Sequence, residues 1–300
     1  NDWQVCVYDL SAEAMAPLVA AGATTAATPA AVTENSDLVI TCLPSPTVSA
    51  AVMEGPEGIL TALAPGKLWA EMSTTDADEV QRLAALVAAK GGAAVDCPVS
   101  GGCHRAATGN ISIFAGAERP VFERVLPVLT TLGRRVLHTG PVGSASILKV
   151  VTNYLATANL VTLCEALTTV KGAGLDLNTA FEAIRISSGT SFVHETESQV
   201  ILNGSRDINF TMDLVAKDIG LFQAIADRAQ VPLEISPRLI EIFDDGIARF
   251  GARAFSPRIV ERLEAATGLD VRAPGFPAEI VDDESEAPGA EVWVPGHGDR

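Results

Sequence analysis

The stretch "SASILKVVTNYLATANLVTLCEALTTVKGAG", residues 144–174, divides this sequence into two patterns. It predicts a helix of about thirty residues, well above the usual ~11–12. Because it is apolar almost all round, we expect the helix to be buried on most faces. Strands alternate with helices before it, and only helical spacing follows it.

Six short apolar runs before this stretch predict strands. Amphipathic segments between several of them predict helices, of which the best marked begins at Asp76 and has Glu79 in a capping-box position. Such alternation favours a mostly parallel sheet covered on both sides. The runs are "WQVCVYD" (3–9), "DLVITCL" (37–43), "KLWAEMS" (67–73), "AAVDCPVS" (93–100), "NISIFAG" (110–116) and "RRVLHTG" (134–140).

After the long helix the spacing predicts further helices, roughly over 176–187, 191–203, 213–229, 234–250 and 256–266. We therefore expect an α/β domain over 1–140 and an all-α domain over 141–268, built on the long helix. Residues 269–300 are rich in Pro, Gly and acid. They are predicted to be a tail, disordered or draped over a surface, with Trp293 as one anchoring contact.

Composition limits the class of protein. The chain has 300 residues, 48% hydrophobic and 19% charged, and a net charge of -16. Such a charge argues against binding to nucleic acid or to a membrane surface. Five cysteines without a CxxC pair favour buried reduced thiols over a disulfide framework or zinc site. With no signal peptide or uninterrupted apolar span of membrane length seen, we expect a soluble cytoplasmic protein.

Asp9, at the end of the first predicted strand, is placed like the ribose-binding acid of a Rossmann-type dinucleotide-binding unit. That acid normally lies about twenty residues after a GxGxxG loop. Only eight residues precede Asp9, and no GxGxxG elsewhere follows a strand and opens a helix. We therefore expect the α/β domain to be N-terminally truncated, without its glycine-rich βα unit. The alternative is that Asp9 merely ends an ordinary strand.

Two later motifs suggest binding and proton transfer. Ser100, Gly101 and Gly102 follow an apolar run, where free backbone N–H groups suit an anion such as a substrate carboxylate. The same residues are also common turn chemistry. Lys149 and Asn153 share one face of the long helix among apolar neighbours. A lysine there is either functional, with a pKa lowered by burial, or extends to solvent from the first turns.

A third motif pairs Lys217 with Asp218, which interrupt a helical apolar stripe; alone, it favours a surface ion pair. In order and separation, these stretches resemble the β-hydroxyacid dehydrogenase family, which includes 3-hydroxyisobutyrate dehydrogenase and tartronate semialdehyde reductase. The resemblance covers about residues 3–268. It rests on "VYD" (7–9), "TCLPSPTVSAAV" (41–52), "EMSTT" (71–75), "DCPVSGG" (96–102), "GPVGSASILKVVTN" (140–153), "CEAL" (164–167), "SSGTS" (187–191) and "KDIGL" (217–221).

The resemblance implies hydride transfer between nicotinamide and a small 3-hydroxy acid. Lys149 would be the general acid/base and Asn153 would orient it and bond the substrate. Ser100, Gly101 and Gly102 would hold the substrate carboxylate. Family members usually form homodimers or homotetramers through the helical domain, so the same is implied here.

The resemblance also implies a set of cofactor contacts. Asp9 would bind the adenine ribose, Leu43 and Pro44 would flank the adenosine, and Thr74 would approach the nicotinamide ribose. Lys217 would reach the cofactor from the helical domain, with Phe210 near it or simply in the core. An acid at Asp9 repels a 2′-phosphate, and no Arg or Lys lies between it and Leu43, so NAD is favoured over NADP.

The sequence departs from the family in places. Ala145 stands at a usual glycine of GxGxxxK and Thr152 at a usual Asn, so substrate or nicotinamide placement is in doubt. His104 and His194 are either pocket residues or, more commonly, structural ones. No cluster predicts a metal site. The alternatives are a tartronate semialdehyde reductase, an imine reductase, and a non-catalytic cofactor-sensing or interaction module; Lys149 argues against the last two.

Overall fold

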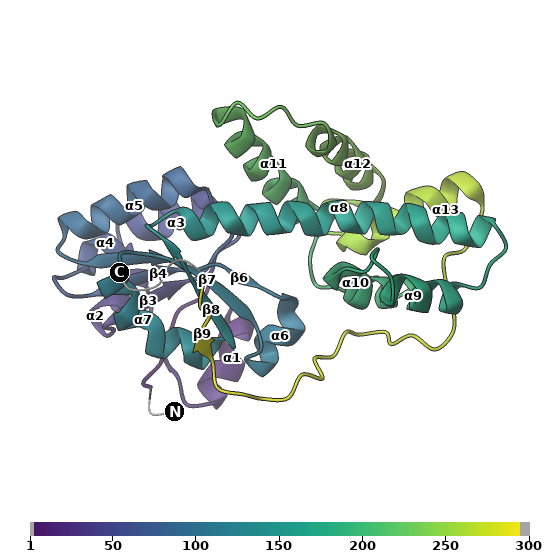
Figure 1. Cartoon of the computed structure of the whole chain (residues 1–300). Coiled ribbons are helices and arrows are strands. Elements are labelled where there is room, and N and C mark those ends of the chain that lie inside the picture. The colour runs from purple at the N-terminus through teal and green to yellow at the C-terminus, as the bar shows by residue number, and fades with distance from the viewer. Residues whose placement is uncertain (1–2, 295–300) are drawn as a thin grey trace. The chain divides into compact units, whose positions relative to one another are not determined.

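The computed structural model describes residues 3–294 and contains two compact units. The first contains residues 3–100, 112–148 and 288–294 of the described chain, and the second contains Gly101–Ile111 and Lys149–Ala287. The helix predicted over 144–174 is α8 (Ser144–Gly172), whose first turn belongs to the first unit. The α/β fold followed by a helical part is confirmed (Figure 1).

The main sheet of the first unit has the strand order β3-β4-β5-β7-β8-β9, with β6 paired to β7. β3, β4 and β5 are parallel, whereas β7 is antiparallel to β5 and β6. Five of the six predicted strand regions supply strands of this sheet, and the region 93–100 supplies two of them. Their bounds are β3 (Leu38–Thr41), β4 (Leu68–Glu71), β5 (Ala93–Asp96), β6 (Val99–Ser100), β7 (Ser112–Gly116) and β8 (Arg135–Gly140).

The first predicted strand is shorter than expected and lies outside this sheet. β1 (Cys6–Val7) pairs only with β2 (Thr24–Thr25), in a separate parallel two-stranded sheet. β2 was not predicted, because two threonines give no apolar run. Asp9 lies two residues after the end of β1, near the carboxyl end of a strand as the sequence suggested.

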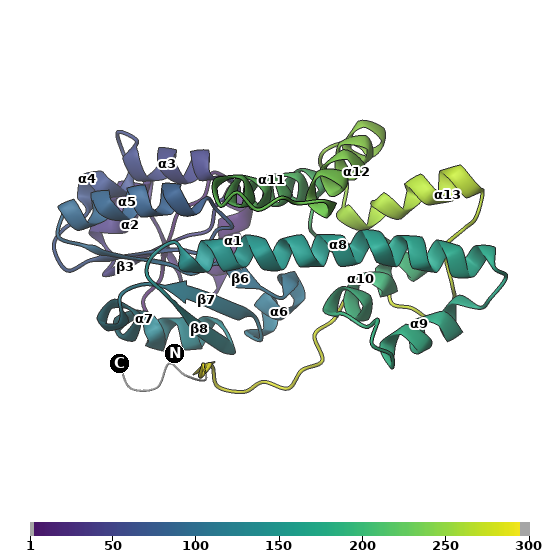
Figure 2. The same ribbon diagram turned by 45° about the horizontal axis from the view of Figure 1, so that its top comes forward.

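Helices cover both faces of the main sheet, with α5 (Ala77–Ala89) on one face and α7 (Arg119–Leu132) on the other (Figures 1 and 2). The Asp76 carboxylate accepts from the N–H groups of Asp78 and Glu79, which confirms the predicted start of α5. Trp69 is fully buried between the layers. The remaining helices of this unit are α1 (Ala12–Ala20), α2 (Pro29–Glu34), α3 (Pro46–Glu54) and α4 (Ile59–Ala62).

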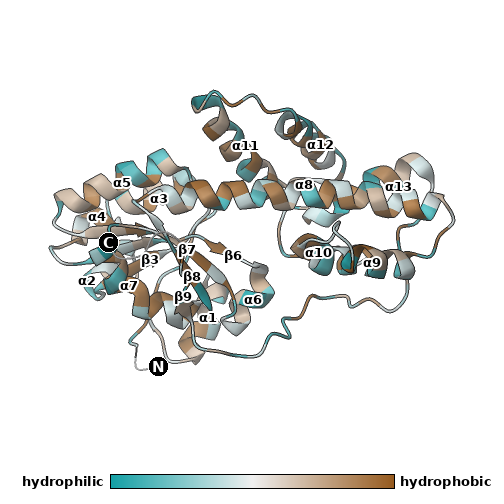
Figure 3. Cartoon of the chain, in the orientation of Figure 1, coloured by the Kyte–Doolittle hydropathy of each residue, from teal (hydrophilic) through white to brown (hydrophobic). Residues whose placement is uncertain are grey.

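The second unit is helical and its predicted helices are all present. Its core packs α8 residues such as Leu167 against Ile201 and Phe243. Brown, apolar faces of α8 and α10 are visible in Figure 3. The helices are α6 (Gly102–Thr108), α9 (Leu177–Arg185), α10 (Phe192–Asn203), α11 (Met212–Arg228), α12 (Ile235–Phe250), the 3-10 helix η1 (Ser256–Val260) and α13 (Glu261–Thr267).

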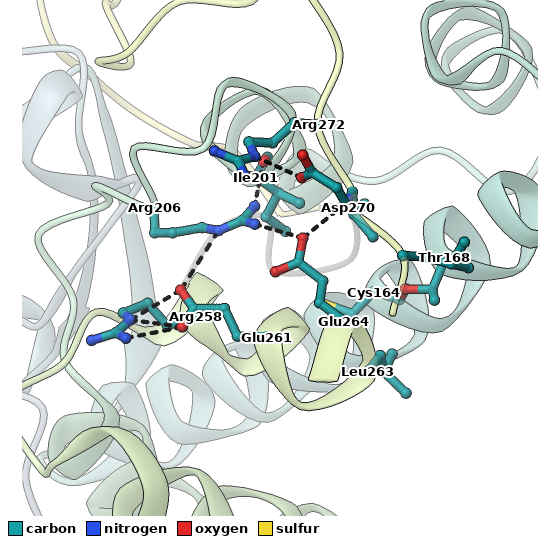
Figure 4. Close-up of polar contacts among 12 residues, drawn as sticks. Cys164, Thr168, Ile201, Arg206, Arg258, Glu261, Leu263, Glu264, Asp270 and Arg272 are labelled. Atoms are coloured by element: carbon teal, nitrogen blue, oxygen red, sulfur yellow. Dashed lines mark hydrogen bonds and ion pairs between the residues drawn. The ribbon is translucent and has the colours of Figure 1, made fainter. Parts of the chain in front are cut away.

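A buried arginine joins α10 to α13 in this unit (Figure 4). Arg206 is 6% exposed and donates to the Ile201 carbonyl and, at 3.0 Å, to Glu264. The same Glu264 oxygen accepts from the Val271 N–H at 2.8 Å. This charge-assisted network fixes the point where the C-terminal segment leaves the helices.

α8 is less buried than predicted. Leu155 is 54% exposed, and Ile147 and Leu148 are 38% and 39% exposed. Within the described residues α8 alone is long and apolar enough, by length and composition, to cross a membrane, although Lys149 and Glu165 interrupt its apolar run. Core helices of soluble proteins meet the same criterion. The burial of Leu160 and Leu167 in the core of the second unit fits a core helix.

The described residues of the acidic C-terminal segment, 269–294, contribute to both units. Val271 is fully buried, and β9 (Ala290–Glu291) pairs in parallel with β8. Glu291 accepts from Arg119 with both carboxylate oxygens. Trp293, predicted as the anchor, is instead 71% exposed. The prediction of a tail draped over a surface therefore stands, but the anchoring contact comes from β9, a two-residue strand that the sequence does not reveal.

Candidate active site

Lys149 lies at one end of a chain of polar contacts within the second unit. It is 8% exposed, and its Nζ donates to Asn153 Oδ1 at 2.8 Å. Asn153 Nδ2 in turn donates to Asp218 Oδ2 at 2.5 Å. Lys217 Nζ lies 3.1 Å from the other oxygen of Asp218. α8 therefore supplies the amine and the amide, and α11 supplies the acid and the second amine.

The environment of Lys149 lowers the pKa of its amine. Burial lowers the pKa of Lys149 to about 8, because the ammonium loses its hydration. The negative charge of Asp218 partly opposes this by raising the pKa, and the positive charge of Lys217 lowers it further. An amine with a pKa near 8 can both accept and donate a proton close to neutral pH.

Asp218 is the residue of this cluster that the sequence did not single out as functional. It is 2% exposed and contacts both Asn153 and Lys217. Its signal was its place next to Lys217, interrupting an apolar helical stripe. An acid on the buried side of α11 needs partners, and those partners come from a helix sixty-five residues earlier in the sequence.

A second buried acid, Asp96, fixes the beginning of α8 in the first unit. It ends β5, is fully buried, and accepts from the N–H groups of Gly143 and Ser146, each at 2.8 Å, and from the Ser146 hydroxyl at 2.9 Å. Burial raises its pKa, and these hydrogen bonds oppose the shift. A Cβ at Gly116 would come within 2.4 Å of the Asp96 carboxylate, so glycine is required there.

The predicted carboxylate cradle has the backbone of a tight turn. Ser100 ends β6, and Gly101 and Gly102 have φ of +132° and +84°, which side chains rarely adopt. A Cβ on Gly102 would lie 2.9 Å from the His104 ring. Ala145, which replaces a usual family glycine, is fully buried, so its methyl group packs inside the protein.

The residues expected to bind the cofactor follow strand ends in the first unit. Leu43 and Pro44 follow β3, and Thr74 follows β4, its neighbour in the sheet. The Leu43 N–H donates to Ser73 Oγ at 2.7 Å, which ties these two turns together. Carboxyl ends of neighbouring parallel strands are where such folds bind ligands.

Asp9 fits recognition of a ribose. It is exposed, and its Oδ1 accepts from the Ser11 N–H at 2.8 Å. Among the described residues Oδ2 has no hydrogen-bond partner, so it can accept from a ligand hydroxyl. His194, in contrast, is buried with its ring bonded to the Phe181 carbonyl, which gives it a structural role. Phe210 packs against the core of the second unit.

Comparison with known proteins decides the family. Residues 1–140 match the NAD-binding domain of 6-phosphogluconate dehydrogenase, and residues 143–261 match the NAD-binding domain of NADP-dependent 3-hydroxyisobutyrate dehydrogenase. The 2-(hydroxymethyl)glutarate dehydrogenase of Eubacterium barkeri is 34% identical over 268 residues, 89% of each chain. The chain belongs to the β-hydroxyacid dehydrogenase family. It is an NAD(P)-dependent oxidoreductase of that family.

Other members of this family are also similar. The NAD-dependent L-serine dehydrogenase of Pseudomonas aeruginosa is 33% identical over 73% of this chain and 76% of its own. The 3-sulfolactaldehyde reductase of Escherichia coli K12 is 29% identical over 90% of this chain and 91% of its own. A 3-hydroxyisobutyrate dehydrogenase structure from Salmonella typhimurium superposes with a TM-score of 0.79 at 24% identity, over 86% of this chain and 90% of its own. This similarity shows a shared fold.

The comparisons also bear on the expected truncation. The match to the NAD-binding domain begins at residue 1. It therefore gives no support to the expectation that the glycine-rich βα unit is missing.

Proposed function

We propose that the chain is an NAD-dependent dehydrogenase that transfers a hydride between nicotinamide and a small 3-hydroxy acid. The observation that carries the proposal is the buried Lys149 with its pKa lowered to about 8 and its contact with Asn153. The similarity to dehydrogenases and a reductase of small acids supports the same reaction type.

Bound nicotinamide would supply the hydride acceptor or donor, and the chain's own residues would manage the proton and the substrate. In the oxidative direction neutral Lys149 accepts the proton of the substrate hydroxyl at Nζ, and in the reductive direction its ammonium returns that proton. Asn153 holds Nζ through its Oδ1, and Asp218 holds Asn153. The ammonium also stabilises negative charge that develops on the reacting oxygen.

Substrate and cofactor binding are assigned to residues at turns and strand ends. Ser100, Gly101 and Gly102 would bind the substrate carboxylate through backbone N–H groups. Asp9 would accept from the ribose hydroxyls and repel a 2′-phosphate, which is the reason for preferring NAD. The other cofactor contacts proposed are those of Leu43, Pro44, Thr74 and Lys217.

The experiment is a titration with NADH and NADPH followed by fluorescence, combined with turnover on a panel of 3-hydroxy acids. We expect binding that favours NADH and turnover of at least one acid. Lys149→Ala should bind the cofactor as the wild type does and lose turnover. Absence of dinucleotide binding by the folded chain would contradict the proposal.

A non-enzymatic role is the second candidate, because one group of relatives is named for something other than a reaction. The cytokine-like nuclear factor N-PAC of Homo sapiens is 27% identical over 80% of this chain, which spans 43% of that protein. Cofactor binding without turnover on the panel would favour such a role. The buried Lys149 cluster is the reason for placing the enzyme first.

We also propose that the protein is a homo-oligomer that uses α8. Leu155, at 54% exposed, is the most exposed large apolar side chain of this helix, with Leu148 one heptad before it. Burial of such side chains in a subunit contact is favourable. Light scattering should give the mass of a dimer or tetramer, and Leu155→Glu should lower it; a wild-type monomer would contradict this.

A further inference from the structure

A cavity of about 270 Å³ lies entirely within the second unit. Four separate segments line it: α6 with Cys103 and His104, the turn before α11 with Asp207 and Asn209, the turn before η1 with Phe255, and the C-terminal segment with Glu279 and Ile280. Asn209 Nδ2 lies 3.5 Å from Cys103 Sγ and joins the first two walls.

The C-terminal wall is held in place on both sides of Glu279. On one side Ser205 Oγ donates to the Ala278 carbonyl at 2.7 Å. On the other side Asn110 Nδ2 donates to Asp282 at 2.7 Å and to the Glu284 carbonyl at 2.8 Å. A wall with anchors this close has little freedom to move away, so Glu279 is a lasting feature of the cavity.

The opposite wall adjoins the turn to which the substrate carboxylate is assigned. His104 lines the cavity, and its ring lies so close to Gly102 that a methyl group there would come within 2.9 Å of it. A substrate held by the Gly101–Gly102 backbone therefore has this cavity beside it. The cavity has room for a substituent of a few non-hydrogen atoms.

The charges of the lining are of one sign. Asp207 and Glu279 are the acids, and no Lys or Arg belongs to the lining within the described chain. Burial lowers the pKa of His104, and the nearby Arg105 adds to the shift, so its ring is neutral at neutral pH. Two carboxylates without a lining cation repel an anion and attract a cation.

We propose that this cavity receives the part of the substrate beyond its carboxylate, and that Asp207 and Glu279 select substrates in which that part is uncharged or bears an ammonium. A second carboxylate or a sulfonate is disfavoured there. This inference rests on the proposed function, because it needs the carboxylate at the Gly101–Gly102 turn. It makes the C-terminal segment, beyond the family match that ends at residue 261, a specificity element.

The experiment compares kcat/KM for three hydroxy acids with the full chain: 3-hydroxyisobutyrate, L-serine and 2-(hydroxymethyl)glutarate. At low salt, we expect kcat/KM for 3-hydroxyisobutyrate or L-serine to exceed that for 2-(hydroxymethyl)glutarate by at least about tenfold. This ratio should become smaller in 0.5 M NaCl, because salt screens the repulsion between carboxylates. In the double variant Glu279→Gln, Asp207→Asn, the ratio of kcat/KM between the preferred acid and the dicarboxylate should be smaller by about three- to tenfold. The Asp207→Asn substitution keeps the side-chain oxygen that accepts from the Asn209 N–H.

The matched control is Glu286→Gln, an exposed acid of the same segment that does not line the cavity. It removes one charge and should change the ratio by less than about twofold. A wild type that prefers the dicarboxylate, or equal ratios of kcat/KM in the Glu279→Gln, Asp207→Asn double variant and in Glu286→Gln, would overturn the inference while leaving the proposed function standing. Absence of turnover on all three acids and the wider panel would instead overturn both.

Discussion

Asp96 and Asp218 are acids of nearly equal burial in different units, and they have opposite kinds of partners. Asp96 is surrounded by neutral donors from the beginning of α8, two N–H groups and one hydroxyl. Asp218 faces an amide and an ammonium, and through Asn153 it is joined to Lys149. The difference indicates that one buried acid fixes a helix and the other belongs to the cluster for which we propose proton transfer.

The largest effect expected is on the cluster side of this comparison. Lys149→Ala should lower kcat by about 10²–10⁴-fold, the usual contribution of a general acid/base. The free energy of unfolding of the Lys149→Ala variant should not be lower than that of the wild type, because burial of the Lys149 ammonium is unfavourable. Steady-state kinetics and urea unfolding measure the two quantities. Lys90→Ala, which removes an exposed lysine at the end of α5, is the control and should leave kcat unchanged.

Asp96→Ala should act on stability. It leaves three donors without an acceptor in a buried place, which costs about 3 kcal/mol of the free energy of unfolding. Asp96→Asn keeps an acceptor oxygen and should lose less. A urea midpoint for Asp96→Ala equal to that of the wild type would remove the basis for the comparison.

Asp218→Asn should act mainly on turnover. The amide keeps the size of the side chain, but it loses the charge that faces Lys217 and raises the pKa of Lys149. Because a lower pKa leaves less Lys149 ammonium, we expect kcat in the reductive direction to fall about tenfold at pH 8, a change of roughly 1.4 kcal/mol, with a smaller loss of stability than in Asp96→Ala. If Asp218→Asn were instead the less stable of the two and fully active, the two acids would have exchanged roles.

A further effect concerns Glu197, an acid that has neither kind of partner. Burial raises the pKa of Glu197 to about 8, and its Oε2 is buried without a hydrogen-bond partner among the described residues. Its folded pKa exceeds the unfolded one, so the folded state loses stability as pH rises from about 4.5 to 8. Because one pKa unit corresponds to about 1.4 kcal/mol, Glu197→Gln should raise the free energy of unfolding by up to about 4 kcal/mol at pH 8 and leave it unchanged at pH 4. Thermal unfolding at both values tests this, and an equal change at both would contradict it.

Much of the fold could be predicted because its signals are local. The helix that begins after Asp76 has its cap, its apolar face and its end within about fifteen residues. The long period-3.6 stretch of α8 needs no knowledge of its partners. β2 and β9 escaped prediction because each is two residues long and depends on a strand elsewhere in the sequence.

The site could be predicted only in part, for the same physical reason. Lys149 and Asn153 are one turn apart, so their contact follows from helix geometry. Asp218 joins them from α11, and the partners of Asp96 lie about fifty residues further along the chain. Contacts across such separations depend on packing, which single stretches of sequence do not contain.

The most direct test of the central claim is the pH dependence of hydride transfer in a single turnover, measured for oxidation of the hydroxy acid. Lys149 must be neutral to accept the proton, so the rate should rise with pH through a midpoint near 8. In Asp218→Asn the midpoint should move to lower pH, because the charge that raises the pKa of Lys149 is gone. A wild-type rate without a transition near pH 8, or a midpoint unmoved in Asp218→Asn, would contradict the account.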